Sequence, residues 1–514
     1  MNMYKIITII IGYGLLVLIG CTDPDPFFEK ETNIIPPVSI GSKTVFVNQG
    51  TNKALLLDST LDGSGETLRV QLSKAPIYME KRKGKHSDVL ILSEGHPGDS
   101  NHKQKAAALT VLNEKGNKKI FKLGNNPFDT IISDPEGEYV VLLRRTLANK
   151  LLKNINEIAI IKLGKNDNTE NSVLYKTLEG TPQNVFYSED FKIDGKKRKI
   201  ACIVASDILF LIDLEHLNRR PTTIYLGKNN TYPILAEQVI FDNKTQRIYV
   251  RSSNANDIFA LKLTTRKVDT DRNDFATALD IIGVGKKPSD MAFFHEDNNS
   301  RLFVVSAGDN DGSLIDVATG KTTTVPFHGN IDSVYLFTKK TMGIKTQHAL
   351  VWEKYGRNFY VLDFKNLEDQ LGKNIRFIGR SYQNAKELLP VLEGNRLLLM
   401  HNGHGLSIID LDVESISPFA SKKKLSESYL DEKQKRFWIA PHNQNRVAYI
   451  DINEGETDDL LLDDTIKDVV PVFDIGVLLI VHGSSAGYVT LIDVKNPTRD
   501  ASRSIKGFIL EDIL

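Results

Sequence analysis

The chain has 514 residues, of which 41% are hydrophobic and 25% are charged, as is ordinary for a globular protein. Its 65 Lys and Arg residues balance its 65 Asp and Glu residues, so no overall positive field favours nucleic acid or an anionic membrane. We therefore expect no nucleic-acid partner. The length suits several ordinary domains or one large repetitive domain.

The first 21 residues, MNMYKIITIIIGYGLLVLIGC, carry one cation, Lys5, followed by an uncharged apolar run from Ile6 to Ile19. A membrane-spanning helix needs about 20 apolar residues, so this shorter run is more typical of a signal peptide. The run ends in LIGC, which resembles the bacterial lipobox, where a cysteine is acylated and becomes the first mature residue. A plain secretory signal or an N-terminal anchor helix is the alternative.

The lipobox resemblance implies a signal peptide over residues 1–20 and lipidation at Cys21, through which the protein would bind the lipid bilayer. It places the protein in the bacterial cell envelope. Thr22 follows the cysteine where an aspartate would be a retention signal in enteric bacteria, so we expect an outer-membrane anchor, with the protein periplasmic or surface-exposed.

Residues 21–40 are expected to form an extended tether, because they contain four prolines and no sustained periodicity. Residues 41–514 are assigned to one folded domain. The second cysteine, Cys202, lies in the apolar run KIACIVASDILFLIDL and is expected to be a buried small hydrophobe. With Cys21 acylated, no intrachain disulfide can form.

One short pattern, an apolar strand that closes on a polar residue, recurs through the chain at intervals of about 40 to 55 residues. Examples are ALLLD, SLIDVATG and VAYID. The closing residues of the ten repeats are Asp58, Asn113, Lys162, Asp213, Lys262, Asp316, Asp363, Asp410, Asp451 and Asp493. The repeats occupy almost everything after the tether.

The clearest unit, residues 282–325, contains four short apolar runs separated by Gly, Asn, Asp and Pro. These are strand residues and turn residues, respectively. Four antiparallel strands in each unit of about 40 to 50 residues are typical of a propeller blade. The sequence therefore predicts an all-β fold, a β-propeller of four-stranded blades.

The unit resembles the YVTN family of propeller repeats. Pro288, the strand RLFVVSAG and the closing strand SLIDVATG carry this resemblance. It implies a ring of seven or eight blades, whereas about ten units are counted. One large ring, two smaller rings, or a 7–8-bladed ring with irregular units all fit the count.

The two ends of the chain suggest how such a ring would close. The chain finishes on the apolar segment SIKGFILEDIL, and the first unit, KTVFVNQGTNKALLLD, lacks an evident inner strand of its own. We therefore predict that the ring is closed by pairing of the N- and C-terminal strands.

Six of the eleven histidines fall in turns between second and third strands. Such turns share one face of a propeller with the links between blades. Five are candidate ligand-binding residues: His96, His401, His404, His442 and His482, with His102 beside the first. Neutral imidazole is a common metal ligand, so His401, His404 and His442 are also candidate metal ligands. The competing interpretation is that these are ordinary polar turn residues.

No cofactor is predicted apart from this possible metal. The sequence lacks a Walker loop, a His-Glu-x-x-His motif, a Gly-x-Ser-x-Gly elbow and a haem attachment motif. The stretch GDNDG at 308–312 is expected to be a hairpin turn, because the twelfth position counted from Asp309 is Gly320 where a calcium loop needs an acid. The recurrent aspartates are expected to cap the turn that follows each third strand.

Three functions remain open. The first is a lipid-anchored, non-enzymatic binding platform that presents its loop face to a protein or a small molecule. The second is a scaffold subunit of an outer-membrane assembly complex, with an obligate protein partner. The third is a lactonase-like or metal-dependent enzyme.

Overall fold

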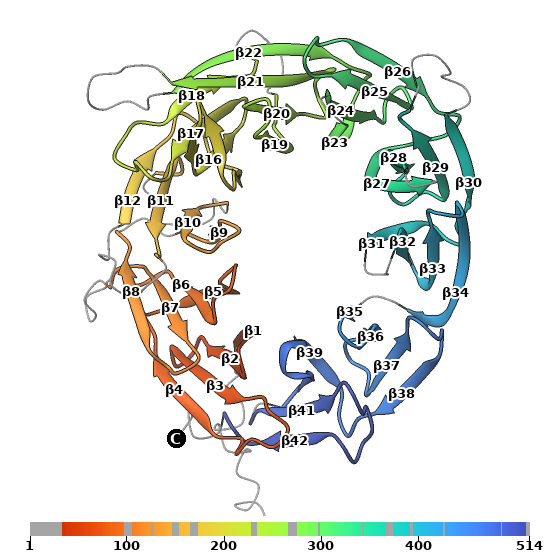
Figure 1. Cartoon of the computed structure of the whole chain (residues 1–514). Helices are drawn as coiled ribbons and strands as arrows, with labels where there is room; N and C mark the ends of the chain where they lie inside the picture. The colour runs from red at the N-terminus through yellow and green to blue at the C-terminus, as the bar shows by residue number, and fades with distance from the viewer. Residues whose placement is uncertain are drawn as a thin grey trace, which may run out of the picture.

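The computed structural model describes residues 33–96, 105–124, 128–145, 154–164, 173–227, 234–265, 275–296, 299–341, 344–365, 367, 374–390, 394–424, 427–484 and 486–509. Within these residues the strands form ten four-stranded antiparallel sheets arranged as the blades of one ring (Figure 1). The all-β propeller fold is thus confirmed, and of the possible ring sizes it is the single large ring that forms.

The first five blades follow one another along the chain. Blade 1 has β1 (Ile34–Ile40), β2 (Lys43–Asn48), β3 (Lys53–Asp58) and β4 (Thr67–Gln71). Blade 2 has β5 (Pro76–Lys81), β6 (Asp88–Ser93), β7 (Ala108–Asn113) and β8 (Lys118–Lys122). Blade 3 has β9 (Thr130–Ser133), β10 (Tyr139–Leu143), β11 (Glu157–Lys162) and β12 (Val173–Thr177). Blade 4 has β13 (Asn184–Tyr187), β16 (Ile200–Ala205), β17 (Ile208–Asp213) and β18 (Thr222–Tyr225), with the hairpin β14 (Phe191–Ile193) and β15 (Lys196–Arg198) inserted after its first strand. Blade 5 has β19 (Gln238–Asp242), β20 (Arg247–Arg251), β21 (Asp257–Thr265) and β22 (Phe275–Gly283).

The second five blades continue the same order. Blade 6 has β23 (Pro288–Glu296), β24 (Asn299–Ser306), β25 (Asp311–Asp316) and β26 (Thr322–Pro326). Blade 7 has β27 (Ser333–Thr341), β28 (Ile344–Trp352), β29 (Asn358–Asp363) and β30 (Ile375–Arg380). Blade 8 has β31 (Ala385–Leu389), β32 (Arg396–His401), β33 (His404–Asp410) and β34 (Ser415–Lys424). Blade 9 has β35 (Ser428–Asp431), β36 (Arg436–Ile439), β37 (Arg446–Asp451) and β38 (Thr457–Leu461). Blade 10 has β39 (Ile466–Val472), β40 (Val477–His482), β41 (Tyr488–Asp493) and β42 (Arg503–Lys506), with the 3₁₀ helix η1 (Phe473–Ile475) between its first two strands.

In every blade the first strand lies nearest the axis and the fourth lies at the outside, as Figure 1 shows. The turns between second and third strands therefore lie on the same side of the ring as the links between blades. We call this side the loop rim; in blade 7 it comprises the turn 353–357 and the link 381–384. The other side, with the remaining turns, is the far rim. Backbone hydrogen bonds join turns to links on the loop rim, for example from Asn402 N to Asn384 O at 2.8 Å.

The hydrophobic core is divided among the ten interfaces between neighbouring blades. Each interface holds one cluster of buried apolar side chains drawn from two adjacent blades. The middle strands face a neighbour on both sides, which is why β16 and β17 are buried along their whole length. Burying both faces requires continuous apolar runs rather than alternation, and this explains the sequence IACIVA in β16.

The predicted closure by pairing of the terminal strands is wrong. Strand β1 belongs to blade 1 and β42 to blade 10, and the two share no sheet. The ring closes through side chains instead: the rings of Phe46 and Phe508 lie 5.1 Å apart, and the Ser39 hydroxyl donates to Pro471 O at 3.3 Å. Because blade 1 has its own inner strand, no strand from the C-terminus is needed to complete it.

The propeller also starts before the expected boundary at residue 41. Strand β1 begins at Ile34 and includes Pro36 and Pro37, which had suggested a tether. Proline lacks the N–H group of the ladder, and it is tolerated in an edge strand or at a bulge. β1 is both, since it is the innermost strand of its blade and its register shifts between Ile35 and Val38.

The predicted capping role of the recurrent aspartates is confirmed. Asp316 Oδ1 accepts a hydrogen bond from Thr319 N at 2.9 Å, and Asp451 Oδ1 accepts one from Asn453 N at 2.9 Å. The stretch GDNDG is a hairpin turn leading into β25, as expected, with Asn310 at a φ of 54°. Cys202 is fully buried in β16, also as expected.

None of the described helical segments is long and apolar enough to cross a bilayer. The predicted signal peptide, Cys21 and most of the tether lie outside the described residues.

Candidate interaction surface

His401 ends β32 on the loop rim and is only 1% exposed. Its Nδ1 lies 3.0 Å from the carbonyl oxygen of Gln383, which can only accept, so Nδ1 carries the proton. Its Nε2 lies 2.8 Å from the Ser407 hydroxyl, which donates to it. Burial lowers the pKa of His401, and this favours the neutral ring that such a pattern requires.

His482 repeats this arrangement in blade 10, where it ends β40 and is 2% exposed. Nδ1 donates to Thr465 O at 3.0 Å, Nε2 accepts from the Thr490 hydroxyl at 2.8 Å, and the ring stacks on Tyr488 with centroids 4.1 Å apart. Burial lowers the pKa of this histidine too. Since both ring nitrogens are bonded within the protein, His401 and His482 tie the third strand of a blade to the link before that blade.

His482 also borders a cavity of about 180 Å³ at the junction of blades 1 and 10. Much of its wall is apolar, and the two ends of the described chain contribute Ile34, Pro36, Phe508 and Ile509 to it.

The remaining candidate histidines lie on three different blades. Both His404, the first residue of β33 in blade 8, and His442, in a turn of blade 9, are exposed, and His442 Nδ1 lies 3.0 Å from Glu427 Oε1. His96 is half-buried in blade 2 and forms an isolated bridge with Lys105. His102 lies outside the described residues.

His401, His404 and His442 do not form a set of metal ligands in the part of the chain that the structure describes. The one group found there with ligand atoms within 4.8 Å of one another is Asp213, Glu215 and His216 in blade 4. Arg198 already occupies this group, since its Nη1 lies 2.9 Å from Asp213 Oδ2 and 3.1 Å from His216 Nδ1. A guanidinium in that position supplies the positive charge that a metal ion would otherwise bring.

The surface feature that stands out is on blade 7. Among the described residues, the three aromatic side chains that are more than half exposed are Tyr382 at 70%, Tyr355 at 55% and Phe377 at 55%; Tyr225, the next, reaches 39%. Tyr355 lies in the turn after β28, Phe377 in β30 and Tyr382 in the link to blade 8. We call these three residues, with the exposed cations Lys354, Arg357 and Arg380, the blade 7 patch.

Local hydrogen bonds hold the patch in shape. Tyr355, with a left-handed φ of 66°, donates its N–H to Ala385 O at 2.9 Å, which joins the turn to the next blade. Ser381 N donates to Arg357 O at 2.9 Å, and Arg357 Nε returns a bond to Ser381 O at 2.9 Å. The Lys354 ammonium lies 5.6 Å from the centre of the Tyr355 ring. Aromatic and arginine side chains in such settings are typical of protein interfaces.

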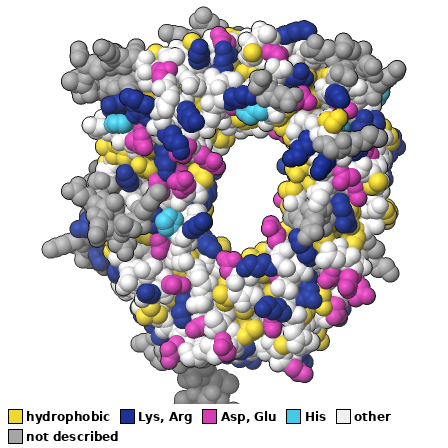
Figure 2. All heavy atoms as spheres, viewed as in Figure 1, with side chains coloured by type: hydrophobic (Ala, Val, Ile, Leu, Met, Phe, Trp, Pro, Cys, Tyr) yellow, Lys and Arg dark blue, Asp and Glu magenta, His cyan; other side chains and the backbone are white. Residues whose placement is uncertain are grey.

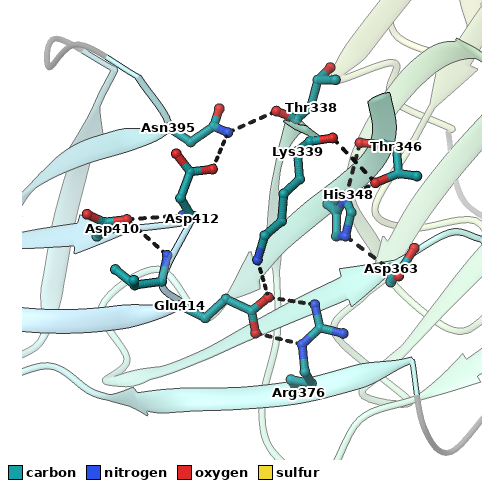
Figure 3. A network of polar contacts seen from close by, with 11 residues as sticks. Thr338, Lys339, Thr346, His348, Asp363, Arg376, Asn395, Asp410, Asp412 and Glu414 are labelled. Carbon is teal, nitrogen blue, oxygen red and sulfur yellow. Dashed lines mark hydrogen bonds and ion pairs between the residues drawn. The ribbon is translucent and has the colours of Figure 1, made fainter. Parts of the chain in front are cut away.

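A half-buried ionic cluster at the far rim joins blades 7 and 8 (Figure 3). Glu414, in the turn between β33 and β34, receives two bonds from Arg376 at 2.6 and 2.7 Å and one from Lys339 at 3.0 Å. Burial alone would raise the pKa of Glu414, but these bonds outweigh it and lower the pKa. We call Lys339, Arg376 and Glu414 the Glu414 cluster. Arg376 precedes Phe377 in β30, so the cluster fixes the strand that carries Phe377 and Arg380.

The middle of the ring is open. Figure 2 shows an opening through the molecule, with both positive and negative side chains around its edge. This mixture matches the balanced composition and gives no single sign of charge for a ligand in the opening.

The sequence did not lead us to the blade 7 patch. Its aromatic residues are separated by up to 27 positions, and each looks like an ordinary strand or turn residue. The available signal was the pairing of Tyr with Lys or Arg in two turn segments, EKYGR and GRSYQ, which strand packing does not need.

No family model matches the chain, so the resemblance to YVTN repeats stays a prediction. No curated protein matches it either. Among solved structures it is similar to the dihydro-heme d1 dehydrogenase NirN in complex with DHE, with a TM-score of 0.43 and 12% identity, covering 74% of this chain and 76% of that one. It is also similar to AztD from Citrobacter koseri, with a TM-score of 0.34 and 13% identity, covering 68% of this chain and 88% of that one. Neither likeness, at a TM-score below 0.5, bears on what this chain binds.

Proposed function

We propose that this protein is a lipid-anchored, non-enzymatic interaction platform of the bacterial cell envelope, and that it binds a protein partner through the blade 7 patch. The observation that carries the proposal is that the three most exposed aromatic side chains in the described part of the chain lie on one blade, beside three exposed cations. Exposing large aromatic side chains to water is unfavourable, and exposed apolar groups that lie together often mark an interaction site.

The lipid anchor rests on the sequence of residues 1–21, with Cys21 as the acylated residue. The described chain starts on the loop rim, because Ile34 pairs with Asn48 at the end of β2. The twelve residues from Cys21 to the one before Asn33 span at most about 40 Å when fully extended. A ring tethered in this way would carry Tyr355 and Tyr382 of the blade 7 patch on the same rim as its anchor, within reach of other envelope proteins.

The positions of the histidines favour binding over catalysis. A general base or a metal ligand needs an imidazole nitrogen that is free to act, and His401 and His482 use both of theirs inside the protein. The exposed His404 and His442 remain for a direct test by metal analysis of the purified protein and of its His404→Ala and His442→Ala variants. Stoichiometric metal that is lost in either variant would favour the enzyme alternative.

The central experiment is photo-crosslinking in intact cells, with a photoreactive amino acid at position 382. The matched control carries it at position 413, because Val413 is 71% exposed but lies on the far rim. We expect crosslinks to a recurrent protein from position 382 and not from position 413. Equal capture at both positions, or none at 382, contradicts the proposal.

The same experiment separates the two forms of a platform. Capture of one protein, with most of the chain crosslinked, points to an obligate scaffold in an envelope assembly, whereas partial capture points to a reversible binder. The anchor has its own test: Cys21→Ser should abolish incorporation of labelled fatty acid and release the protein from membranes. Retention in the membrane fraction would overturn the lipid anchor and leave the interaction surface untouched.

A further inference from the structure

The cations of the blade 7 patch are more exposed than the carboxylates beside them. Lys354, Arg357 and Arg380 are exposed, whereas Glu353 and Asp332 are half-buried and accept hydrogen bonds from within the protein. Glu353 accepts a bond from Asn330 Nδ2 at 3.2 Å, and Asp332 Oδ1 accepts bonds from the Ser333 hydroxyl at 2.7 Å and from Lys354 N at 2.6 Å. The three cations outnumber the two carboxylates and are the more exposed groups, so a partner meets aromatic rings beside a small positive excess, in a protein whose overall charge is zero.

Both guanidinium groups are held by their own blade. Arg357 Nε donates to Ser381 O at 2.9 Å, and Arg380 Nε donates to Asn358 Oδ1 at 3.1 Å. Fixing Nε restricts the side chain before any partner arrives, so less conformational entropy is lost when the terminal nitrogens bind. The planar fork of a guanidinium suits a carboxylate, which it can bind with two parallel hydrogen bonds.

The blade 7 patch occupies two sides of the molecule. Tyr355 and Tyr382 lie on the loop rim, whereas Phe377 lies in β30, the outermost strand of its sheet. Strand β30 pairs with β29, and no other strand in the described part of the chain pairs with its outer edge. An edge strand offers backbone groups to which an extended segment can add.

We propose that the partner binds blade 7 through an acidic, extended polypeptide segment that crosses the loop rim at Tyr382 and continues along β30. This proposal rests on the proposed function and names the chemistry of its partner. Carboxylates of the segment pair with Arg357 and Arg380, and its apolar side chains contact the exposed aromatic rings. A flat bilayer would touch one plane of the ring and would leave Phe377 unused, so a polypeptide fits this surface better than a membrane does.

The test uses the full-length lipidated protein in nonionic detergent. The probe is a fluorescein-labelled poly-glutamate peptide, followed by fluorescence anisotropy, with poly-lysine of equal length as the opposite-charge control. We expect the protein to bind poly-glutamate and not poly-lysine, and to lose affinity as ionic strength rises. The double variant Arg357→Gln with Arg380→Gln should weaken binding by about tenfold or more.

Two further variants serve as controls. Lys321→Gln removes an exposed cation from the far rim and should leave binding unchanged. Arg357→Lys with Arg380→Lys keeps the charge without the fork, so partial recovery relative to the glutamine variant shows that charge and geometry both contribute. Equal anisotropy for all variants overturns the acidic-segment inference. A second result would also overturn it: the protein binds phosphatidylglycerol vesicles, and the glutamine variant loses this binding but still binds poly-glutamate.

The outcomes separate this inference from the platform itself. If the cellular partner still crosslinks at position 382 in the Arg357→Gln, Arg380→Gln variant, and at high salt, the platform stands and the acidic segment is refuted. Failure of position 382 to capture any protein refutes both. Loss of the crosslink in the glutamine variant, with poly-glutamate binding lost in parallel, supports both.

Discussion

The Glu414 cluster gives the sharpest test of how neighbouring blades are held together. The change is Glu414→Gln, which keeps the shape of the side chain but removes the charge that receives three bonds, from Arg376 and Lys339. Hydrogen bonds to charged groups contribute about 1.5–3 kcal/mol each, and breaking a buried pair costs about 3–5 kcal/mol.

The Glu414 side chain is 17% exposed and that of Arg376 is 38% exposed, so solvent screens part of this interaction. The amide also retains some hydrogen bonding. We therefore expect a loss of about 2 kcal/mol in the free energy of unfolding, below the value for a fully buried pair. With an unfolding entropy of about 2.1 cal/mol/K per residue, a ring of this size that unfolds as one unit should lose roughly 2 °C in Tm.

The assay is thermal unfolding followed by circular dichroism. The matched control is Lys433→Met, which breaks a salt bridge to Asp474 between blades 9 and 10 whose side chains are 61% and 79% exposed. Such exposed pairs contribute about 0–1 kcal/mol. A double-mutant cycle of Glu414→Gln with Arg376→Met should give a coupling of about 1 kcal/mol. If Glu414→Gln shifts the Tm no more than the control does, or if the cycle shows no coupling, the reasoning is refuted.

Three other predictions concern the core and the histidines. The pKa values of His401 and His482 are lowered in the folded protein, so below about pH 6.5 the unfolded chain binds protons that the folded protein does not. The denaturant concentration at the unfolding midpoint should therefore decrease as the pH is lowered from 7 to 5, and should decrease less in a His401→Gln variant. A midpoint that does not change with pH argues against neutral buried rings. Phe46→Ala removes a fully buried ring from the junction of blades 1 and 10 and should lower the free energy of unfolding in urea by about 3–5 kcal/mol. Hydrogen exchange should become faster first in β1 and β42, whereas a uniform increase in exchange would show that this junction is no weaker than the others. Burial raises the pKa of Cys202 to about 12, so its thiol should react with a disulfide reagent only after unfolding; rapid labelling of the native protein contradicts the burial.

Local pattern was enough to predict the repeating unit. Ten strands that close on a polar residue predicted ten repeating units, because a strand buried on both faces needs a continuous apolar run and its turn needs a capping group. In the structure each unit is one blade. Asp316 and Asp451 cap their turns through hydrogen bonds to residues two or three positions away, so the local sequence is enough to predict this capping.

Contacts between distant segments were not accessible in this way. His401 was predicted to be a turn residue open to a ligand. In the structure it bonds to Gln383, in the link before blade 8, and to Ser407, in β33, and only the folded blade brings these two residues to it. Pro36 and Pro37 suggested a tether because prolines disrupt most strands. They are tolerated in β1 because it is an edge strand, and the sequence does not show which strand lies at the edge of a sheet.

The sequence by itself therefore determined the strands, the turns, the number of repeating units and the signature of a lipid anchor, whereas the structure decided that these units form one ring. Only the tertiary structure decided that blades 1 and 10 meet through side chains such as Phe46 and Phe508, and that Tyr355, Phe377 and Tyr382 are all left exposed on one blade. The physical reason is that strand and turn preferences act over a few residues. Closing a ring, and leaving a side chain on its surface, depends on how whole blades pack against one another.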